Sequence, residues 1–204
     1  MNRLRVTVCA LVFGLTGVSA ATAQNYNYRP YVGIEGTSDK GHYPAIEGLG
    51  TTTGGPENSL RGQSVFVGAR VTPTFGLELG YGTSGSTSRT DSASGITSTV
   101  DVRDRLTFDL MGYSPLGRPG LELIGLIGAS RSRLNLSVTD GNNTDTSTGT
   151  SSGGHIGVGA QMLIASRIGL RGIVEREMNM VHQDGAGSHR YNGWALKVGA
   201  LYQF

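Results

Sequence analysis

The sequence predicts an all-β protein, an eight-stranded antiparallel up-and-down barrel that crosses a membrane. Eight segments alternate apolar with small or polar residues, as a strand with two different faces does. The connections between these segments alternate between long polar tracts and short turns. Only 37% of the residues are hydrophobic and 33 are glycine, which suits a barrel whose apolar residues point outward. A partly disordered secreted protein fits this composition less well.

The N-terminus has the features of a secretory signal peptide. Arg3 and Arg5 precede an apolar stretch at residues 6–18, and small residues follow up to Ala23. A basic start, an apolar core and a small-residue cleavage site are the parts of such a peptide. The core is too short for a membrane-spanning helix. We therefore expect a signal peptide at residues 1–23, with cleavage after Ala20 as an alternative, and one mature domain at residues 24–204.

Removal of this peptide changes the charge balance. Two of the 17 Lys and Arg residues leave with it, so the mature chain carries 15 basic and 15 acidic residues. No basic cluster remains, and we expect no nucleic-acid partner. The single cysteine, Cys9, also leaves, so no disulfide is expected.

The eight predicted strands follow one another with a regular rhythm of connections. They span residues 28–36, 60–72, 75–82, 100–113, 121–136, 153–165, 168–178 and 193–204. The long tracts between them span residues 37–59, 83–99, 137–152 and 179–191, and the other links are short. Transmembrane barrels have short periplasmic turns and longer extracellular loops. The rhythm therefore predicts both termini in the periplasm and four surface-exposed, mobile loops.

Each strand is expected to turn one apolar face to lipid. The outward residues of the first seven strands are Val32 and Ile34; Val65, Val67, Ala69 and Val71; Phe75, Leu77, Leu79 and Tyr81; Val102, Leu106, Phe108 and Leu110; Leu121, Leu123, Gly125, Ile127 and Ala129; Ile156, Val158, Ala160, Met162 and Ile164; and Leu170, Gly172 and Val174. In the fifth strand the assignment is less decisive, because Ile124 and Leu126 make both faces apolar.

The closing strand places Trp194, Tyr202 and Phe204 on its apolar face, with aliphatic residues between them. Aromatic rings at both ends of an apolar face are typical of a strand that crosses a bilayer. The segment from Asn192 to the terminal phenylalanine resembles the last strand of the small OmpA-like and OmpX-like outer-membrane barrels. This resemblance implies a location in the bacterial outer membrane. It also implies that these three aromatic residues form part of a signal for the barrel-assembly machinery.

Charged residues repeatedly lie opposite the apolar faces. The predicted inward set is Glu35, Arg70, Glu78, Arg103, Arg105, Asp109, Glu122, Arg171, Glu175 and Lys197. An eight-stranded barrel is just wide enough for side chains to fill, so these residues are expected to form a structural ion-pair network in the lumen. A narrow gated pore is the alternative.

The sequence gives little support for catalysis. His182, Asp184, Ser188 and His189 share the fourth tract, but a nucleophile and its base need rigid support, and the glycines at positions 185 and 187 favour flexibility. The histidines have no short-range metal spacing, and residues 140–143 suggest a turn more than a calcium loop. We expect no catalytic residues, no cofactor and no metal.

An envelope-structural or surface-interaction role is therefore the expected function, with outer-membrane lipids and lipopolysaccharide as surroundings. A host surface or matrix ligand is a possible partner of the loops. A small gated pore and, less strongly supported, an outer-membrane lipid-modifying enzyme are the alternatives.

Overall fold

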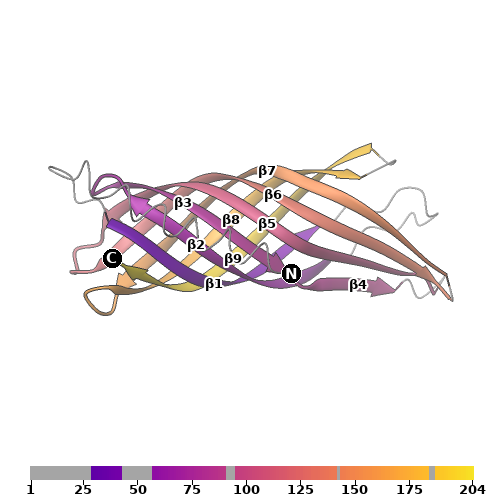
Figure 1. Cartoon of the computed structure of the whole chain (residues 1–204), viewed down its shortest axis with the longest axis horizontal. Helices are drawn as coiled ribbons and strands as arrows, with labels where there is room; N and C mark the ends of the chain where they lie inside the picture. The colour runs from indigo at the N-terminus through magenta and orange to yellow at the C-terminus, as the bar shows by residue number, and fades with distance from the viewer. Residues whose placement is uncertain (1–28, 43–56, 91–94, 142, 184–186) are drawn as a thin grey trace.

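The computed structural model describes residues 29–42, 57–90, 95–141, 143–183 and 187–204. These residues form one closed β-barrel whose strands are steeply tilted to its long axis (Figure 1). The predicted signal peptide lies outside the described residues. No helix in the described ranges is long and apolar enough to cross a membrane.

The barrel is built from antiparallel neighbours. Its strands are β1 Arg29–His42, β2 Glu57–Arg70, β3 Phe75–Ser84, β4 Ser86–Thr90, β5 Thr97–Pro115, β6 Leu121–Asp140, β7 Asn143–Leu163, β8 Ile168–Gln183 and β9 Gly187–Gln203. The order in the sheet is β3-β2-β1-β9-β8-β7-β6-β5-β4, and pairing of β3 with β5 closes it. Because β3 and β4 are separated only by Gly85 and both pair with β5, they form one strand of an eight-stranded barrel. The predicted fold class is confirmed.

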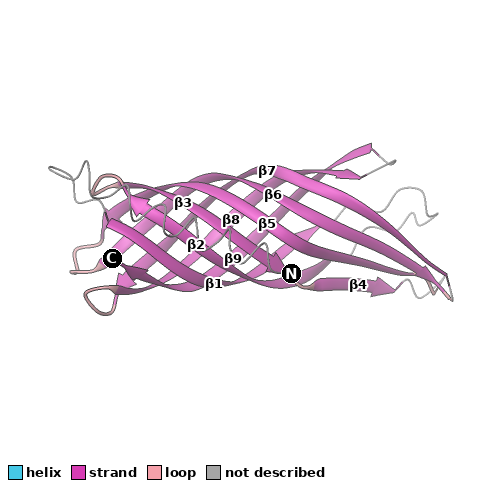
Figure 2. Cartoon of the chain, viewed as in Figure 1, coloured by secondary structure: helices cyan, strands magenta, loops and turns pink. Residues whose placement is uncertain are grey.

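The two ends of the barrel differ. One end, here called the turn end, carries three short connections, at residues 71–74, 116–120 and 164–167, together with Arg29 and Phe204. Gly117 and Gly120 have φ angles of 73° and 80°, a region that glycine adopts without steric cost. We call the opposite end the extended end, because strands continue there into long hairpins (Figure 2).

The structure corrects the expectation of mobile loops for the described parts of the four polar tracts, while residues 43–56, 91–94, 142 and 184–186 lie outside the described residues. β6 and β7 run to a tight turn at which Asp140 pairs with Asn143, and β8 and β9 pair as far as Gln183 and Gly187. β4 extends the second tract along β5. Threonine is β-branched and favours strands, and cross-strand threonine pairs such as Thr139 with Thr144, 3.1 Å apart, hydrogen-bond directly. Most described residues of these tracts are therefore in the sheet.

An apolar belt surrounds the wall. Every strand except β4 contributes outward residues, among them Ile34 (65% exposed), Val158 (65%) and Val198 (60%). Soluble monomers rarely expose a contiguous apolar surface of this extent, whereas a transmembrane barrel needs one facing the lipid. The alternation is regular along β3, where exposed and buried side chains follow one another from Phe75 to Ser84.

One expected face is wrong. Between Val102 and Asp104 the pairing of β5 with β6 shifts, as a β-bulge does by placing two residues opposite one. Val102 is therefore only 6% exposed, and it points inward. Arg103, predicted to point into the lumen, has a side chain that is 65% exposed on the outer wall, where it lies 3.6 Å from Asp101.

Candidate functional site

The barrel interior is the candidate functional site, and Arg171 on β8 lies at its centre. Its guanidinium donates two hydrogen bonds to Glu78, at 2.6 and 2.8 Å, and one to Glu35 at 2.6 Å. β8 and β3 are separated by three strands on each side of the barrel, so the pair of Arg171 and Glu78 spans the lumen. The guanidinium also lies 3.5 Å from the ring centroid of Phe66, a cation–π contact.

Lys197 extends this group along the wall. Its Nζ lies 2.8 Å from Glu175 and 3.8 Å from Glu35. Ser64 donates a 2.9 Å hydrogen bond to Glu35. Gly199 makes room here, because a Cβ at this position would lie 2.7 Å from the Cβ of Glu35. One carboxylate therefore joins two cations and a hydroxyl.

Two further groups of polar contacts lie towards the extended end. Arg105 on β5 contacts Glu177 on β8 and lies 3.4 Å from Asp39 on β1. Asp109 accepts or shares a hydrogen bond with His155 Nε2 at 2.5 Å, and both side chains are almost fully buried. These pairs again connect strands that are not neighbours in the sheet.

Near the turn end, Arg70 makes a two-pronged contact with Glu122, with one of its hydrogen bonds at 2.9 Å. The same guanidinium lies 3.9 Å from the ring centroid of Tyr113. The hydroxyl of Tyr113 is 3.0 Å from that of Tyr31, which donates to Glu78 at 3.0 Å. The turn-end ion pair is thus linked to the central one through two tyrosines.

Nine of the ten charged residues assigned to the lumen from the sequence lie inside the barrel, and Arg103 is the exception. Asp39 and Glu177 belong to the network but were not in that set. Asp39 falls in a tract that the sequence predicts to be a loop. Its signal was the continuing alternation of Glu35, Thr37 and Asp39 past the expected end of the strand.

The lumen is less polar than expected. One apolar cluster crosses it near the extended end, and two others lie closer to the turn end. The clusters are Leu60, Val100, Val102, Leu134 and Val181; Met111, Tyr113, Ile124, Leu126 and Ile173; and Tyr31, Phe66 and Leu201. The first is here called the apolar plug. A cavity of about 20 Å³ beside Glu35 and Lys197 has room for about one water molecule.

The predicted assembly residues lie on the outer wall of β9 and just beyond it. Trp194 is 53% exposed, Tyr202 38% and Phe204 54%. The rings of Tyr202 and Phe204 meet edge to face with centroids 5.3 Å apart. Arg167 donates a 3.1 Å hydrogen bond to the Tyr202 hydroxyl. Two aromatic rings therefore lie at the turn end and one lies towards the extended end.

The residues considered for catalysis are only partly described. The backbone of His182 pairs with that of Ser188 in the β8–β9 hairpin, while Asp184 and the side chains of Ser188 and His189 lie outside what the structure describes. In the described part of the chain, no group of three or more His, Cys, Asp or Glu residues could hold a metal ion.

A family model decides the classification. The model of the outer membrane protein beta-barrel domain matches residues 8–204. The chain belongs to this family. It is accordingly a protein of the bacterial outer membrane. No curated protein matches the sequence significantly.

Solved structures agree in fold. Neisserial surface protein A is 14% identical, with 86% of this chain and 97% of that protein covered and a TM-score of 0.56. Ail, the attachment invasion locus protein of Yersinia pestis, in complex with the heparin analogue sucrose octasulfate, is 12% identical, with coverage of 87% and 99% and a TM-score of 0.50. A major outer membrane protein from Thermus thermophilus is 15% identical, with coverage of 86% and 99% and a TM-score of 0.50. At these identities the likeness concerns the fold.

Proposed function

We propose that this outer-membrane barrel does not conduct and that it displays its extended end on the cell surface, in a structural or surface-interaction role. The filled lumen supports this proposal: Arg171 and Glu78 join opposite walls, and the apolar plug lies beyond them. An apolar constriction resists wetting and ion passage. A small gated pore is the competing proposal. The role proposed is binding or structural, and it assigns no catalysis to the chain.

The orientation is part of the proposal. Short connections and both chain ends lie together at the turn end, and transmembrane barrels place their short turns in the periplasm. The extended hairpins then lie outside the cell. In this orientation Tyr202 and Phe204, two of the three residues proposed to contact the barrel-assembly machinery, lie on the periplasmic side, whereas Trp194 lies towards the cell surface.

Cysteine labelling of intact cells tests the orientation. The one native cysteine, Cys9, lies in the predicted signal peptide. Thr146→Cys, at an exposed site of the extended end, is expected to react with a membrane-impermeant maleimide on intact cells. Thr74→Cys, exposed in a connection of the turn end, is expected to react only after the outer membrane is permeabilised. The reverse pattern contradicts the proposed orientation.

A trimmed hairpin tests the surface role. Leu136 and Ser147 are direct partners on β6 and β7, so an Asn-Gly turn can replace residues 137–146 without changing the register. Adherence of intact cells to matrix proteins and heparin is then compared at equal barrel level. Heparin is included because the Ail structure holds a heparin analogue. Loss of adherence supports a binding role, and unchanged adherence with detergent leakage in cells lacking the barrel supports a structural one.

A further inference from the structure

Three outward cations and a tryptophan lie together on the wall where the apolar belt ends towards the extended end. Lys40 on β1, Trp194 on β9 and Arg176 on β8 are direct neighbours across three strands. Arg61 on β2 lies diagonally from Lys40, because its partner is Ser38. Diagonal neighbours on one face of a sheet are about 7–8 Å apart. We call Lys40, Arg61 and Arg176 the cation patch.

The described acids of β1 and β8 point away from the cation patch. The acids on β1 and β8 are Glu35, Asp39, Glu175 and Glu177, and all four are buried in the lumen. β9 contains no acidic residue, and the one acid of β2, Glu57, is the first residue of that strand and pairs with His42. Among the described residues, no cation of the patch forms an ion pair. The described acids of β1 and β8 therefore pair with cations in the lumen, whereas Lys40 and Arg176 lie on the outer face of the same strands.

The opposite wall shows what a neutralised arrangement looks like. On β5 and β6, Arg103 lies 3.6 Å from Asp101 and Arg133 lies 4.0 Å from Asp104. Asp104 also accepts a 2.6 Å hydrogen bond from Tyr81. Outward arginines with acid partners thus exist in the same barrel and provide a matched comparison for the cation patch.

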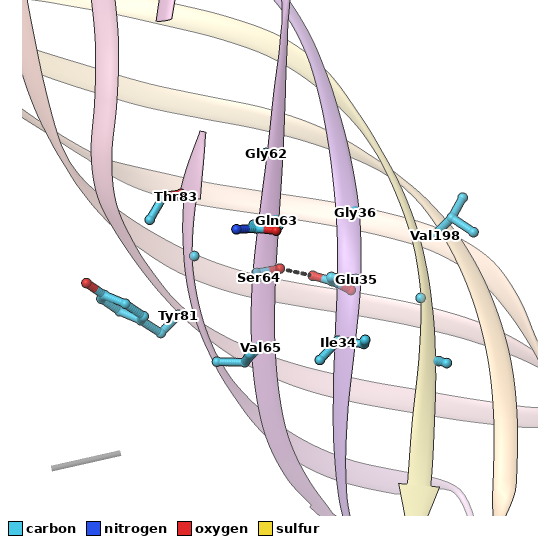
Figure 3. A pocket seen from close by; sticks show the side chains of 13 residues that line it. Ile34, Glu35, Gly36, Gly62, Gln63, Ser64, Val65, Tyr81, Thr83 and Val198 are labelled. Atoms are coloured by element: carbon cyan, nitrogen blue, oxygen red, sulfur yellow. Dashed lines mark hydrogen bonds between the residues drawn. The ribbon is translucent and has the colours of Figure 1, made fainter. Parts of the chain in front are cut away.

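An apolar groove begins two residues from Arg61, at Gln63. It has a volume of about 710 Å³ and crosses β9, β1, β2 and β3. Ile34, Val65, Tyr81 and Val198 border it (Figure 3). Gly36 lies at the bottom of the groove and has no side chain to fill it. The nearest atom to a Cβ built at this position is 4.0 Å away.

The polar groups beneath the groove are already satisfied. Ser64 and Glu35 also line it, but they hydrogen-bond to each other at 2.9 Å (Figure 3), and Glu35 is held by Arg171 in the lumen. The groove therefore offers apolar contact, and the positive charge lies beyond its end towards the extended end. A ligand that matches both parts carries phosphate at one end and an acyl chain at the other.

We propose that this wall is a binding site for lipopolysaccharide, with a phosphate on the cation patch and an acyl chain in the groove. The inference rests on the proposed orientation, which places the patch at the outer leaflet. Arginine and lysine bind phosphate by charge-assisted hydrogen bonds. A free sulfated glycan would use the cations but not the groove, and the groove lies within the lipid-facing belt, so the lipid is the favoured ligand.

The site can be tested on the purified full-length protein in zwitterionic detergent. The fluorescence of Trp194, the only tryptophan, reports binding. The probes are lipopolysaccharide, the same material after enzymatic dephosphorylation, phosphatidylglycerol and heparin. The variants are Lys40→Gln with Arg61→Gln, and the matched control Arg103→Gln with Arg133→Gln. Arg176 is left unchanged because its guanidinium lies 5.0 Å from the Trp194 ring centroid.

We expect lipopolysaccharide to bind more tightly than the other three probes. Each surface cation contributes about fivefold to binding of an anionic lipid, so the patch variant is expected to bind about 25-fold more weakly, while the control pair stays within about twofold. Equal losses in both pairs, or equal binding of dephosphorylated lipid or phosphatidylglycerol, would overturn the proposal. Heparin binding of equal strength at the patch would identify a glycan site instead.

A groove variant separates the acyl chain from the charge. Gly36→Leu fills the groove and leaves every charged side chain of the cation patch in the sequence, and it is expected to weaken lipopolysaccharide binding at least tenfold. Unchanged binding would contradict the assignment of the groove. A binding measurement in detergent does not depend on orientation in the cell. Failure here is therefore distinct from failure of the proposed function, which the cysteine labelling reports.

Discussion

Arg171→Met is expected to remove the largest single contribution to the stability of the lumen. The substitution keeps a long side chain against Phe66 but removes the charge between Glu35 and Glu78. Arg171 is only 4% exposed, and its three hydrogen bonds to carboxylates measure 2.6, 2.6 and 2.8 Å. Its loss leaves two buried acids facing each other without their shared cation.

Arg171→Met affects the two acids unequally, and this difference determines the expected loss in the free energy of unfolding. Glu35 retains Ser64 at 2.9 Å and Lys197 at 3.8 Å, whereas Glu78 retains only the Tyr31 hydroxyl at 3.0 Å among the described residues. Removing one partner of a buried ion pair costs about 3–5 kcal/mol, mostly from the charge left behind. We expect the free energy of unfolding of Arg171→Met to fall by this amount. Glu78→Gln in the same chain should recover part of it.

Urea unfolding in lipid vesicles, followed by the fluorescence of Trp194, measures this effect. The matched control is Arg103→Met, the same substitution at a side chain that is 65% exposed and 3.6 Å from its acid. Exposed pairs contribute about 0–1 kcal/mol, so the control should change little. Equal destabilisation by the two substitutions, or a loss of less than about 1 kcal/mol for Arg171→Met, would refute the reasoning.

Two further predictions concern the inner and outer faces of the wall. Gly128→Ala should lower the free energy of unfolding by about 1–3 kcal/mol, because its Cβ would overlap Asp109 Oδ1. Gly125→Ala on the same strand meets no atom within 4 Å and should be near neutral. The same urea titration measures both variants, and equal effects would contradict the close packing of Gly128 against Asp109. Val158→Arg on the apolar belt should cost about 2–4 kcal/mol, as cations do on the lipid face near the midplane, and Thr146→Arg at the extended end should cost little. If both arginines are tolerated alike in vesicle refolding, the belt does not mark the bilayer.

Period-two alternation predicted most of the fold, because a closed barrel turns one face of every strand to lipid. It assigned the faces of β3 up to Gly82 and of β7 from His155 onward, and even in β6 it favoured the outward face that the structure shows. It failed at Arg103, where a bulge inserts one residue and inverts the faces on one side of it. Nothing in the residue types around Val102 indicated this bulge.

The sequence predicted which charged residues point into the lumen but not which of them contact each other. Single-strand alternation places Arg171 and Glu78 inside, but their contact depends on which strands lie opposite each other and on the stagger of the closed sheet. Asp39 was missed because its strand continues into a tract of polar residues. A tract rich in serine and threonine has a composition typical of loops, although threonine favours β-structure once a neighbouring strand is present. The apolar plug likewise arises from four separate strands.

The measurement that tests the central claim most directly is single-channel recording of the purified full-length protein in planar bilayers. The filled lumen predicts no discrete openings for the unaltered chain at any holding potential that the bilayer withstands. Arg103→Met, which changes only the outer wall, should be equally silent. Discrete openings whose conductance or ion selectivity changes in Glu78→Gln would contradict the account and show that the lumen is a pore.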